Sequence, residues 1–230
     1  MKSISQKNID FFHKNKNYSQ KISDIDTYKI IFSKINNLIK NSKNLLDIGH
    51  GGVFEYNTKN IKKITGLDLN RMISSKKLPK NIFLKIGSAT KIPDHLGKFD
   101  TILMNMLLHH VVGSNVSENL NKLNICLRNS YNHLNKNGKL IIIESCVENW
   151  FYNLEKILYI PTKIIIDKLL KHPPVFQYTK EIIYQKIKEN NFRKIKIKKI
   201  NLGRYILQFG IRVPSYLAPV SVYMFLAKKI

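Results

Sequence analysis

The chain has 230 residues and is strongly basic, with 39 Lys and Arg against 15 Asp and Glu and a formal net charge of +24 at pH 7. Its length suffices for the core of one domain. Two cysteines give no disulfide framework, no apolar run approaches the roughly 20 residues that span a bilayer, and the first residues lack the apolar core of a secretory signal. We therefore expect a single domain over residues 1–230, located in the cytoplasm.

The positive charge is scattered along the chain and accompanies an excess of Asn and Ile. An AT-rich genome supplies this composition without selection for an anionic partner, although nucleic acid and an anionic membrane surface remain alternatives. The densest cluster, residues 193–200, alternates Lys and Ile with a period of two. This pattern predicts a half-buried strand with one solvated face.

The first 40 residues are expected to be helical and to cover the edge of a sheet. Apolar side chains recur there at the spacing of one helix face. They are Ile25, Tyr28, Ile31, Phe32, Ile35 and Leu38.

The most informative segment follows this helix. The apolar run at residues 45–48 leads into a turn that contains Gly49, His50, Gly51 and Gly52, and a second short strand at residues 64–69 reaches Asp68 near its end. Glycines let a backbone pass close to a nucleoside, and a carboxylate at the end of the next strand binds the ribose hydroxyls. The pattern predicts a nucleoside site in a βαβ unit.

The acid Asp47, the glycines Gly49 and Gly51 and the later Asp68 resemble motif I and its partner acid in the class I S-adenosylmethionine (SAM)-dependent methyltransferases, although Val53 replaces the third glycine. The resemblance implies that Asp47, Gly49 and Gly51 hold the methionine part of SAM. It implies that Asp68, with Leu69 beside it, holds the ribose. His50 would shape the turn or lie near the methionine part.

Three further segments follow in the order that this family has. Residues 83–90 are expected to form a strand and a turn, in which Ser88 and Ala89 would contact the adenine. Residues 98–105 are expected to form a strand that ends at Asn105, a further cofactor contact. Residues 134–139 are expected to form a turn before a strand at 140–144. The resemblance implies an α/β, Rossmann-like, seven-stranded, mostly parallel sheet with helices on both faces. Residues 194–200 and 221–227 would be its last two strands.

His109 and His110 follow the fourth strand, at the carboxyl edge where such sheets bind ligands. Histidine removes a proton from a hydroxyl acceptor near neutral pH. Neighbouring residues point in different directions, so only one is expected to face the pocket, and we favour His110 slightly over His109. No metal site is expected.

Residues 148–178 form a helical insertion after the fifth strand, with two apolar faces separated by a break at Pro161. Such an insertion can be a lid over an apolar acceptor, a dimer contact, or a peripheral membrane contact. The long connection at residues 201–219 is a second candidate for function. From these two segments we expect the acceptor to contact Trp150, His172, Tyr178 and Arg204.

These observations predict a SAM-dependent methyltransferase that acts on a small, fairly apolar acceptor, with a hydroxyl as the favoured methylated group. The segment after the fourth strand lacks the proline-rich turn of enzymes that methylate adenine amino groups, and no RNA-binding appendage is present. An RNA methyltransferase is the first alternative. A non-catalytic SAM-binding regulatory or assembly protein is the second.

Overall fold

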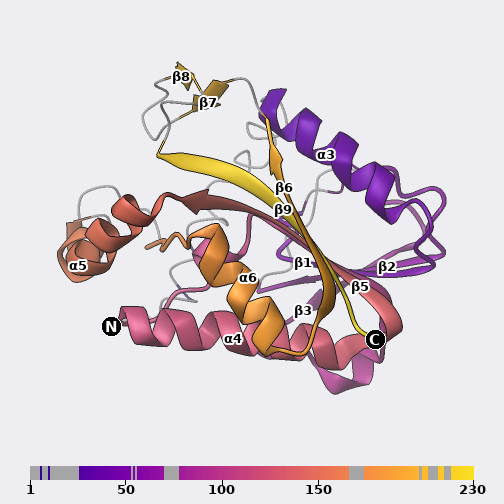
Figure 1. Cartoon of the computed structure of the whole chain (residues 1–230). Coiled ribbons are helices and arrows are strands. Elements are labelled where there is room, and N and C mark those ends of the chain that lie inside the picture. The colour runs from indigo at the N-terminus through magenta and orange to yellow at the C-terminus, as the bar shows by residue number, and fades with distance from the viewer. Residues whose placement is uncertain are drawn as a thin grey trace.

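The computed structural model describes residues 6, 10, 26–52, 54, 56–69, 78–165, 174–201, 204–206, 212–214 and 219–230. Its centre is a seven-stranded sheet with the strand order β3-β2-β1-β4-β5-β9-β6 (Figure 1). The strands are β1 (Asn44–Ile48), β2 (Lys63–Asp68), β3 (Ile82–Ile86), β4 (Phe99–Asn105), β5 (Leu134–Val147), β6 (Arg193–Ile200) and β9 (Val220–Lys228).

The first five strands of the sheet are parallel, and β9 pairs antiparallel with both β5 and β6. The expected mostly parallel, Rossmann-like sheet is therefore confirmed. Apolar residues fill the central strands on both faces, as a sheet covered on both sides requires.

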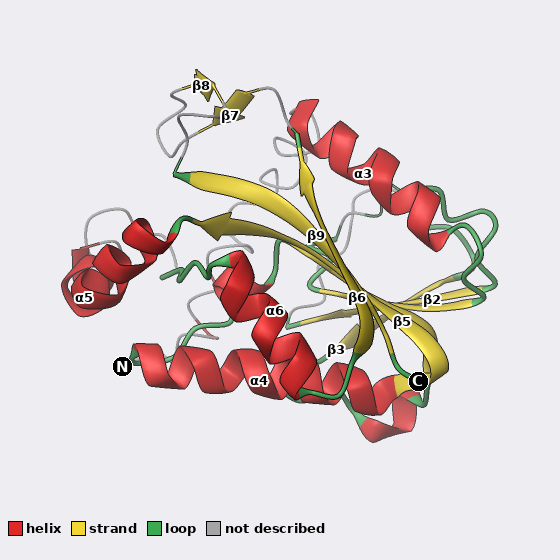
Figure 2. Ribbon diagram, in the orientation of Figure 1, coloured by secondary structure: helices red, strands yellow, loops and turns green. Residues whose placement is uncertain are grey.

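Helices cover the two faces of the sheet (Figure 2). Helix α3 (Asp26–Ile39) packs on one face through Ile31, Ile35 and Ile39. Helices α4 (Val116–His133) and α6 (Lys180–Glu189) pack on the other. Side-chain caps fix where both of these helices begin: Asn115 accepts a hydrogen bond from the Glu118 N–H at 2.9 Å, and Thr179 accepts one from the Ile182 N–H at 3.2 Å.

The insertion after β5 is helical, as expected, but it differs in one detail. Helix α5 (Asn149–Ile165) continues through Pro161, where the sequence predicted a break. A proline inside a helix removes one hydrogen bond and crowds the preceding turn. Because Pro161 lies on an exposed stretch of α5, the helix can bend there without disturbing the core.

One further expectation, on where a strand begins, was wrong. β5 begins at Leu134, so the predicted turn at residues 134–139 lies within the strand, where a register shift and the positive φ of Asn137 (64°) absorb it. The connection at residues 201–219 contains a small antiparallel pair, β7 (Arg204–Ile206) and β8 (Arg212–Pro214).

The Lys/Ile segment forms strand β6 as predicted, but it is less buried than expected. It lies at the edge of the sheet and pairs only with β9, so most of its side chains are exposed. Two short 3-10 helices complete the described elements, η1 (Asp94–Leu96) and η2 (Leu108–His110). Among the described helices, none is both long and apolar enough to cross a membrane.

Candidate functional site

The turns after β1 and β4 meet at the carboxyl edge of the sheet. β1 pairs with β2 on one side and with β4 on the other, so the strand order reverses between β1 and β4. Such a reversal opens a crevice that binds ligands in open α/β sheets. The glycine turn follows β1 and the segment Met106–His110 follows β4, which places both at this crevice.

The glycine turn has a left-handed backbone at three of its residues. Gly49, Gly51 and Gly52 have φ values of 74°, 59° and 82°, a region that side chains with a Cβ rarely adopt. A Cβ on Gly51 would have no atom within 4 Å, so open space lies beside this glycine. The turn therefore presents its backbone to an open space at the carboxyl edge of β1.

His50 and Asp68 hold the turn in this shape. The His50 Nδ1 atom accepts a hydrogen bond from the Gly52 N–H at 2.8 Å, and its ring stacks on Phe54 at 4.6 Å. Burial lowers the pKa of His50, which favours the neutral ring that this hydrogen bond requires. The Asp68 carboxylate accepts a hydrogen bond from the Gly51 N–H at 3.0 Å, so the end of β2 is tied to the turn.

Asp47 is buried near the end of β1, two residues before Gly49, and accepts a hydrogen bond from a tyrosine. The Tyr56 hydroxyl donates a hydrogen bond to the Asp47 carboxylate at 2.7 Å. Burial raises the pKa of Asp47 to about 7; the Tyr56 hydrogen bond opposes this shift, and the charge of Asp68 adds to it. Tyr56 was not predicted as a partner, because no sequence pattern pairs it with Asp47, which lies nine positions earlier in the chain.

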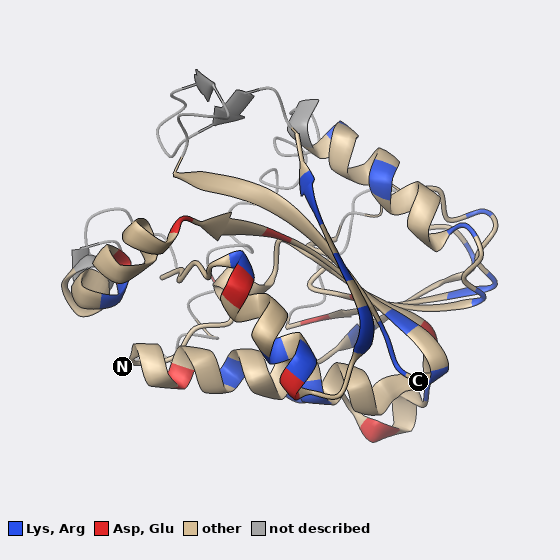
Figure 3. Cartoon of the chain, viewed as in Figure 1, with Lys and Arg blue, Asp and Glu red and all other residues tan. Residues whose placement is uncertain are grey.

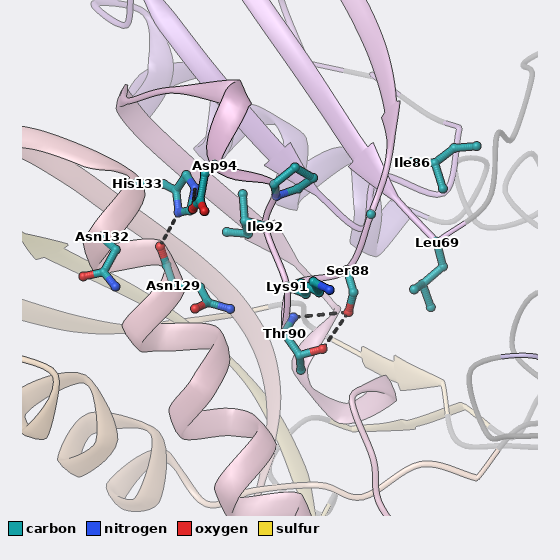
Figure 4. Close-up of a pocket in the computed structure, with 12 residues that line it drawn as sticks. Leu69, Ile86, Ser88, Thr90, Lys91, Ile92, Asp94, Asn129, Asn132 and His133 are labelled. Atoms are coloured by element: carbon teal, nitrogen blue, oxygen red, sulfur yellow. Dashed lines mark hydrogen bonds and ion pairs between the residues drawn. The ribbon is translucent and has the colours of Figure 1, made fainter.

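A cleft of about 620 Å³ begins near the end of β2 and follows the segment that connects β3 to β4 (Figure 4). Leu69 and Ser88, two expected cofactor residues, lie toward one end of it, and Asp94 and His133 lie toward the other. The Ser88 hydroxyl lies 2.9 Å from that of Thr90, and the buried Ala89 carbonyl accepts a hydrogen bond from the Asn129 amide at 3.2 Å. The turn after β3 is therefore fastened to α4.

The turn after β4 contains a paired histidine. The His109 Nδ1 atom lies 2.6 Å from the Oε1 atom of Glu144, which is fully buried in β5. The other oxygen of Glu144 accepts a hydrogen bond from the Leu108 N–H at 2.7 Å, so one carboxylate orients both the turn and the ring. The His110 ring lies 4.1 Å from the His109 ring, centroid to centroid. At the end of β4, the buried Asn105 Oδ1 has no hydrogen-bond partner among the described residues.

A second carboxylate, Glu155, approaches this region from α5. Its Oε1 atom accepts a hydrogen bond from the Gln177 N–H at 3.2 Å, and the Gln177 side chain donates to the Ser145 hydroxyl at 3.0 Å. The Ser145 N–H in turn donates to Glu144 at 2.9 Å. Burial raises the pKa of Glu155 to about 7, while the backbone hydrogen bond from Gln177 and the nearby His109 oppose the shift. The sequence analysis overlooked Glu155, although it is the only acid between Asn149 and Ile165.

Of the four expected acceptor contacts, the structure describes the side chains of Tyr178 and Trp150. Tyr178 is fully buried, and its hydroxyl donates to the Asn119 carbonyl at 3.1 Å, so it belongs to the core rather than to a ligand surface. Trp150 lies on the exposed side of α5. His172 lies outside the described residues; Arg204 is placed in β7, and its side chain is not described.

Together, the sheet, the glycine turn and the acid at the end of β2 define an α/β domain of the kind that binds a nucleoside at its strand-order reversal. Residues 46–142, from β1 to β5, match the family model described as a methyltransferase domain. This match covers less than half of the chain, and over these residues the chain is similar to methyltransferase domains.

Solved structures with this fold cover nearly the whole chain at low sequence identity. A possible histamine N-methyltransferase from Thermotoga maritima aligns with a TM-score of 0.62 at 16% identity, over 95% of this chain and 98% of its own. The N-methyltransferase NodS from Bradyrhizobium japonicum aligns with a TM-score of 0.61 at 12% identity, over 99% of both chains.

Human N-acetylserotonin methyltransferase aligns with a TM-score of 0.57 at 15% identity over 93% of this chain, which spans only 54% of that enzyme. These likenesses concern the fold. No curated protein sequence matches the chain significantly.

Proposed function

We propose that this protein transfers the methyl group of SAM to a small-molecule acceptor, and that a hydroxyl is the group methylated. The observation that carries the proposal is the contact between His109 and the buried Glu144, at the same edge of the sheet as the glycine turn. We further propose that the whole chain, residues 1–230, works as one domain.

The residues at the crevice fit SAM. The open space beside Gly51 leaves room for the methionine part of the ligand over the turn, and the unsatisfied Asn105 Oδ1 can accept a hydrogen bond from it. Asp68 would hold the ribose, Leu69, Ser88 and Ala89 the adenine, while Asp47 and His50 would support the turn. The SAM sulfonium supplies an activated methyl group.

His109 is the proposed general base. When the Nδ1–H of His109 donates a hydrogen bond to Glu144, the Nε2 atom is the ring nitrogen that would take the proton of an acceptor hydroxyl. The acceptor oxygen becomes a better nucleophile as its proton moves to His109, and the fixed turn holds it in line with the methyl group. Glu144 acts as a positioning residue, because it binds both the ring and the backbone of the turn.

This assignment differs in emphasis from the sequence analysis, which favoured His110. Both histidines follow the same strand, and the pairing with Glu144 is what favours His109. The carboxylate lies 35 residues further along the chain. Glu155, whose pKa is raised by burial, would contact a polar group of the acceptor from the side of α5.

The decisive experiment is calorimetric titration of the purified protein with SAM, with S-adenosylhomocysteine and NAD in parallel. We expect SAM and S-adenosylhomocysteine to bind and NAD not to bind. Asp68→Ala should weaken SAM binding by about tenfold or more, since a charge-assisted hydrogen bond to the ribose is lost. Glu189→Ala is the control, because Glu189 is an exposed carboxylate on α6 that does not line the cleft. Absence of SAM binding by a folded protein would refute the proposal.

A further inference from the structure

Helix α5 exposes an unusual apolar face. Trp150 and Ile157 are 63% and 77% exposed. Leu154, Leu158 and Ile160 are also exposed, and the series 150, 154, 157, 158 follows the spacing of one helix face. Soluble surfaces rarely gather large apolar side chains in one patch, so a patch of this kind marks a contact site.

The opposite face of α5 is fastened to the domain. The buried Tyr159 donates a hydrogen bond to the Gly113 carbonyl at 3.0 Å, and Tyr152 packs edge-on against Phe176 at 5.7 Å. Glu155 is turned inward by its hydrogen bond from Gln177. The packing of the inner face therefore fixes the orientation of α5 and keeps the apolar face toward solvent.

Charge distinguishes the surfaces that could cover this face. The chain carries a formal net charge of +24, so two copies repel each other as they approach. An anionic surface attracts the same charge. On α5 itself the one acid points inward, while Lys156 is exposed beside the apolar side chains. A helix with an apolar face, an aromatic residue at its end and basic neighbours has the composition of an interfacial membrane helix.

The position of α5 fits such a contact. It lies at one end of the molecule, beyond the carboxyl end of β5 (Figure 1). Its 17 residues extend over about 25 Å at 1.5 Å per residue, enough for the helix to lie along a membrane surface.

We propose that the outer face of α5 binds the surface of an anionic lipid bilayer, with Trp150, Leu154, Ile157 and Leu158 inserted at the level of the headgroups. The contact is peripheral, and it does not depend on the proposed methyl transfer. It places the site at the carboxyl edge of the sheet near the membrane.

The chain contains a built-in reporter, since Trp150 is its only tryptophan. The experiment adds vesicles of phosphatidylcholine with phosphatidylglycerol, or of phosphatidylcholine alone, to the full chain at 0.1 M NaCl. Tryptophan emission is recorded and the bound fraction is measured by co-sedimentation. We expect a blue shift and binding with the anionic vesicles, and neither with the neutral ones.

Two variants locate the contact. Ile157→Glu should weaken vesicle binding by about tenfold or more, because a carboxylate would enter the apolar layer and face anionic headgroups. Ile230→Glu is the matched control: it makes the same change of charge at another exposed isoleucine, at the far end of the chain, and should bind like the wild type. Thermal unfolding confirms that both variants fold.

Three results would overturn the proposal. The first is no blue shift with anionic vesicles. The second is equal binding by Ile157→Glu and the wild type, which would place the attraction elsewhere, as on the lysines of β6. The third is a blue shift that depends on protein concentration without lipid, together with a doubled mass in light scattering, which would show that a second copy covers the face.

Discussion

Asp47 illustrates how one buried side chain links the stability of the site to pH. Its carboxyl group is buried near the end of β1, holds the Tyr56 hydroxyl and has a pKa of about 7. In the unfolded chain an aspartate has a pKa near 3.9. Between these two values the folded protein keeps a proton that the unfolded chain has released.

We therefore expect Asp47 to lower the free energy of unfolding as the pH rises from about 4 to about 7, by a few kcal/mol at most. Asp47→Asn removes the titration and keeps an oxygen for Tyr56. Urea denaturation at pH 5 and pH 8 should show a smaller loss of stability for this variant than for the wild type. Asp94→Asn, at an exposed carboxylate, should leave the difference unchanged. An equal loss in Asp47→Asn and the wild type would contradict the assignment.

Kinetic measurements on variants of the two histidines that follow β4 should show which of them is the general base. With an acceptor identified by screening, His109→Ala should lower kcat by about 10²–10⁴-fold, since the proton acceptor is lost. The affinity for SAM should stay unchanged. His110→Ala and the exposed His95→Ala serve as comparisons and should retain most of the activity. A larger loss in His110→Ala would return the role of base to His110, as the sequence first suggested.

At the scale of elements, the turns after β1 and β4 are in direct contact. A Cβ on Gly49 would lie 2.5 Å from a methyl carbon of Leu107, so the cofactor turn and the histidine turn pack without space between them. Gly51 has a similar backbone but open surroundings. Substitutions at the two glycines therefore distinguish two causes of lost stability: a strained backbone at both positions, and a steric clash at Gly49 alone.

Gly51→Ala should lower the free energy of unfolding by about 1–2 kcal/mol, the cost of a left-handed backbone for an alanine. Gly49→Ala should lower it further, because the new methyl group displaces Leu107 as well. Adding Leu107→Ala should relieve only this second part, so the double variant should be less destabilised than the sum of its two single changes. Chemical denaturation of the wild type, Gly49→Ala, Leu107→Ala and the double variant measures the coupling between the two positions. Strict additivity of the two single changes would show that the turns do not touch.

Local sequence patterns predicted much of the fold. The predictions that were wrong concern segments whose structure depends on contacts with residues far along the chain. Apolar runs that end at glycine or at a polar residue correctly predicted β1, β2 and β4, because the pattern of a buried strand lies within its own residues. β5 began earlier than predicted because pairing with β4 carries the strand through a bulge at Asn137. Helix α5 continued past Pro161, because the packing of its inner face supports a helix that local propensity disfavours.

The same distinction between local patterns and distant contacts applies to the residues of the candidate site. The glycines and Asp68 were predicted from spacing alone, since a tight turn and a nearby acid leave a mark in the sequence. Tyr56, Glu144 and Glu155 act through contacts with residues far along the chain or in irregular segments. An acid in an otherwise apolar strand, as at Glu144, is the one signal that could have singled out the partner of His109.

At the scale of the whole molecule, the positive charge covers several elements instead of one groove (Figure 3). The edge strand β6 carries Arg193, Lys194, Lys196, Lys198 and Lys199, mostly exposed, and β9 ends in Lys228. Lysines on an edge strand discourage pairing with another sheet. The same charges repel one another across the folded protein, and few acids are present to balance them.

This balance predicts that salt stabilises the protein. Raising NaCl from 0.05 M to 0.5 M shortens the range of repulsion to a few ångströms and should raise Tm by several degrees, on the order of 2–4 °C for each kcal/mol of repulsion removed. A protein held mainly by exposed ion pairs would respond in the opposite direction, because salt screens attraction as well. Thermal unfolding followed by circular dichroism at several NaCl concentrations measures the effect, and KCl should reproduce it, since screening depends on ionic strength rather than on the cation. A Tm that stays constant or falls would mean that the scattered lysines are too well solvated to repel one another, and that the net charge of +24 has little effect on the folded state.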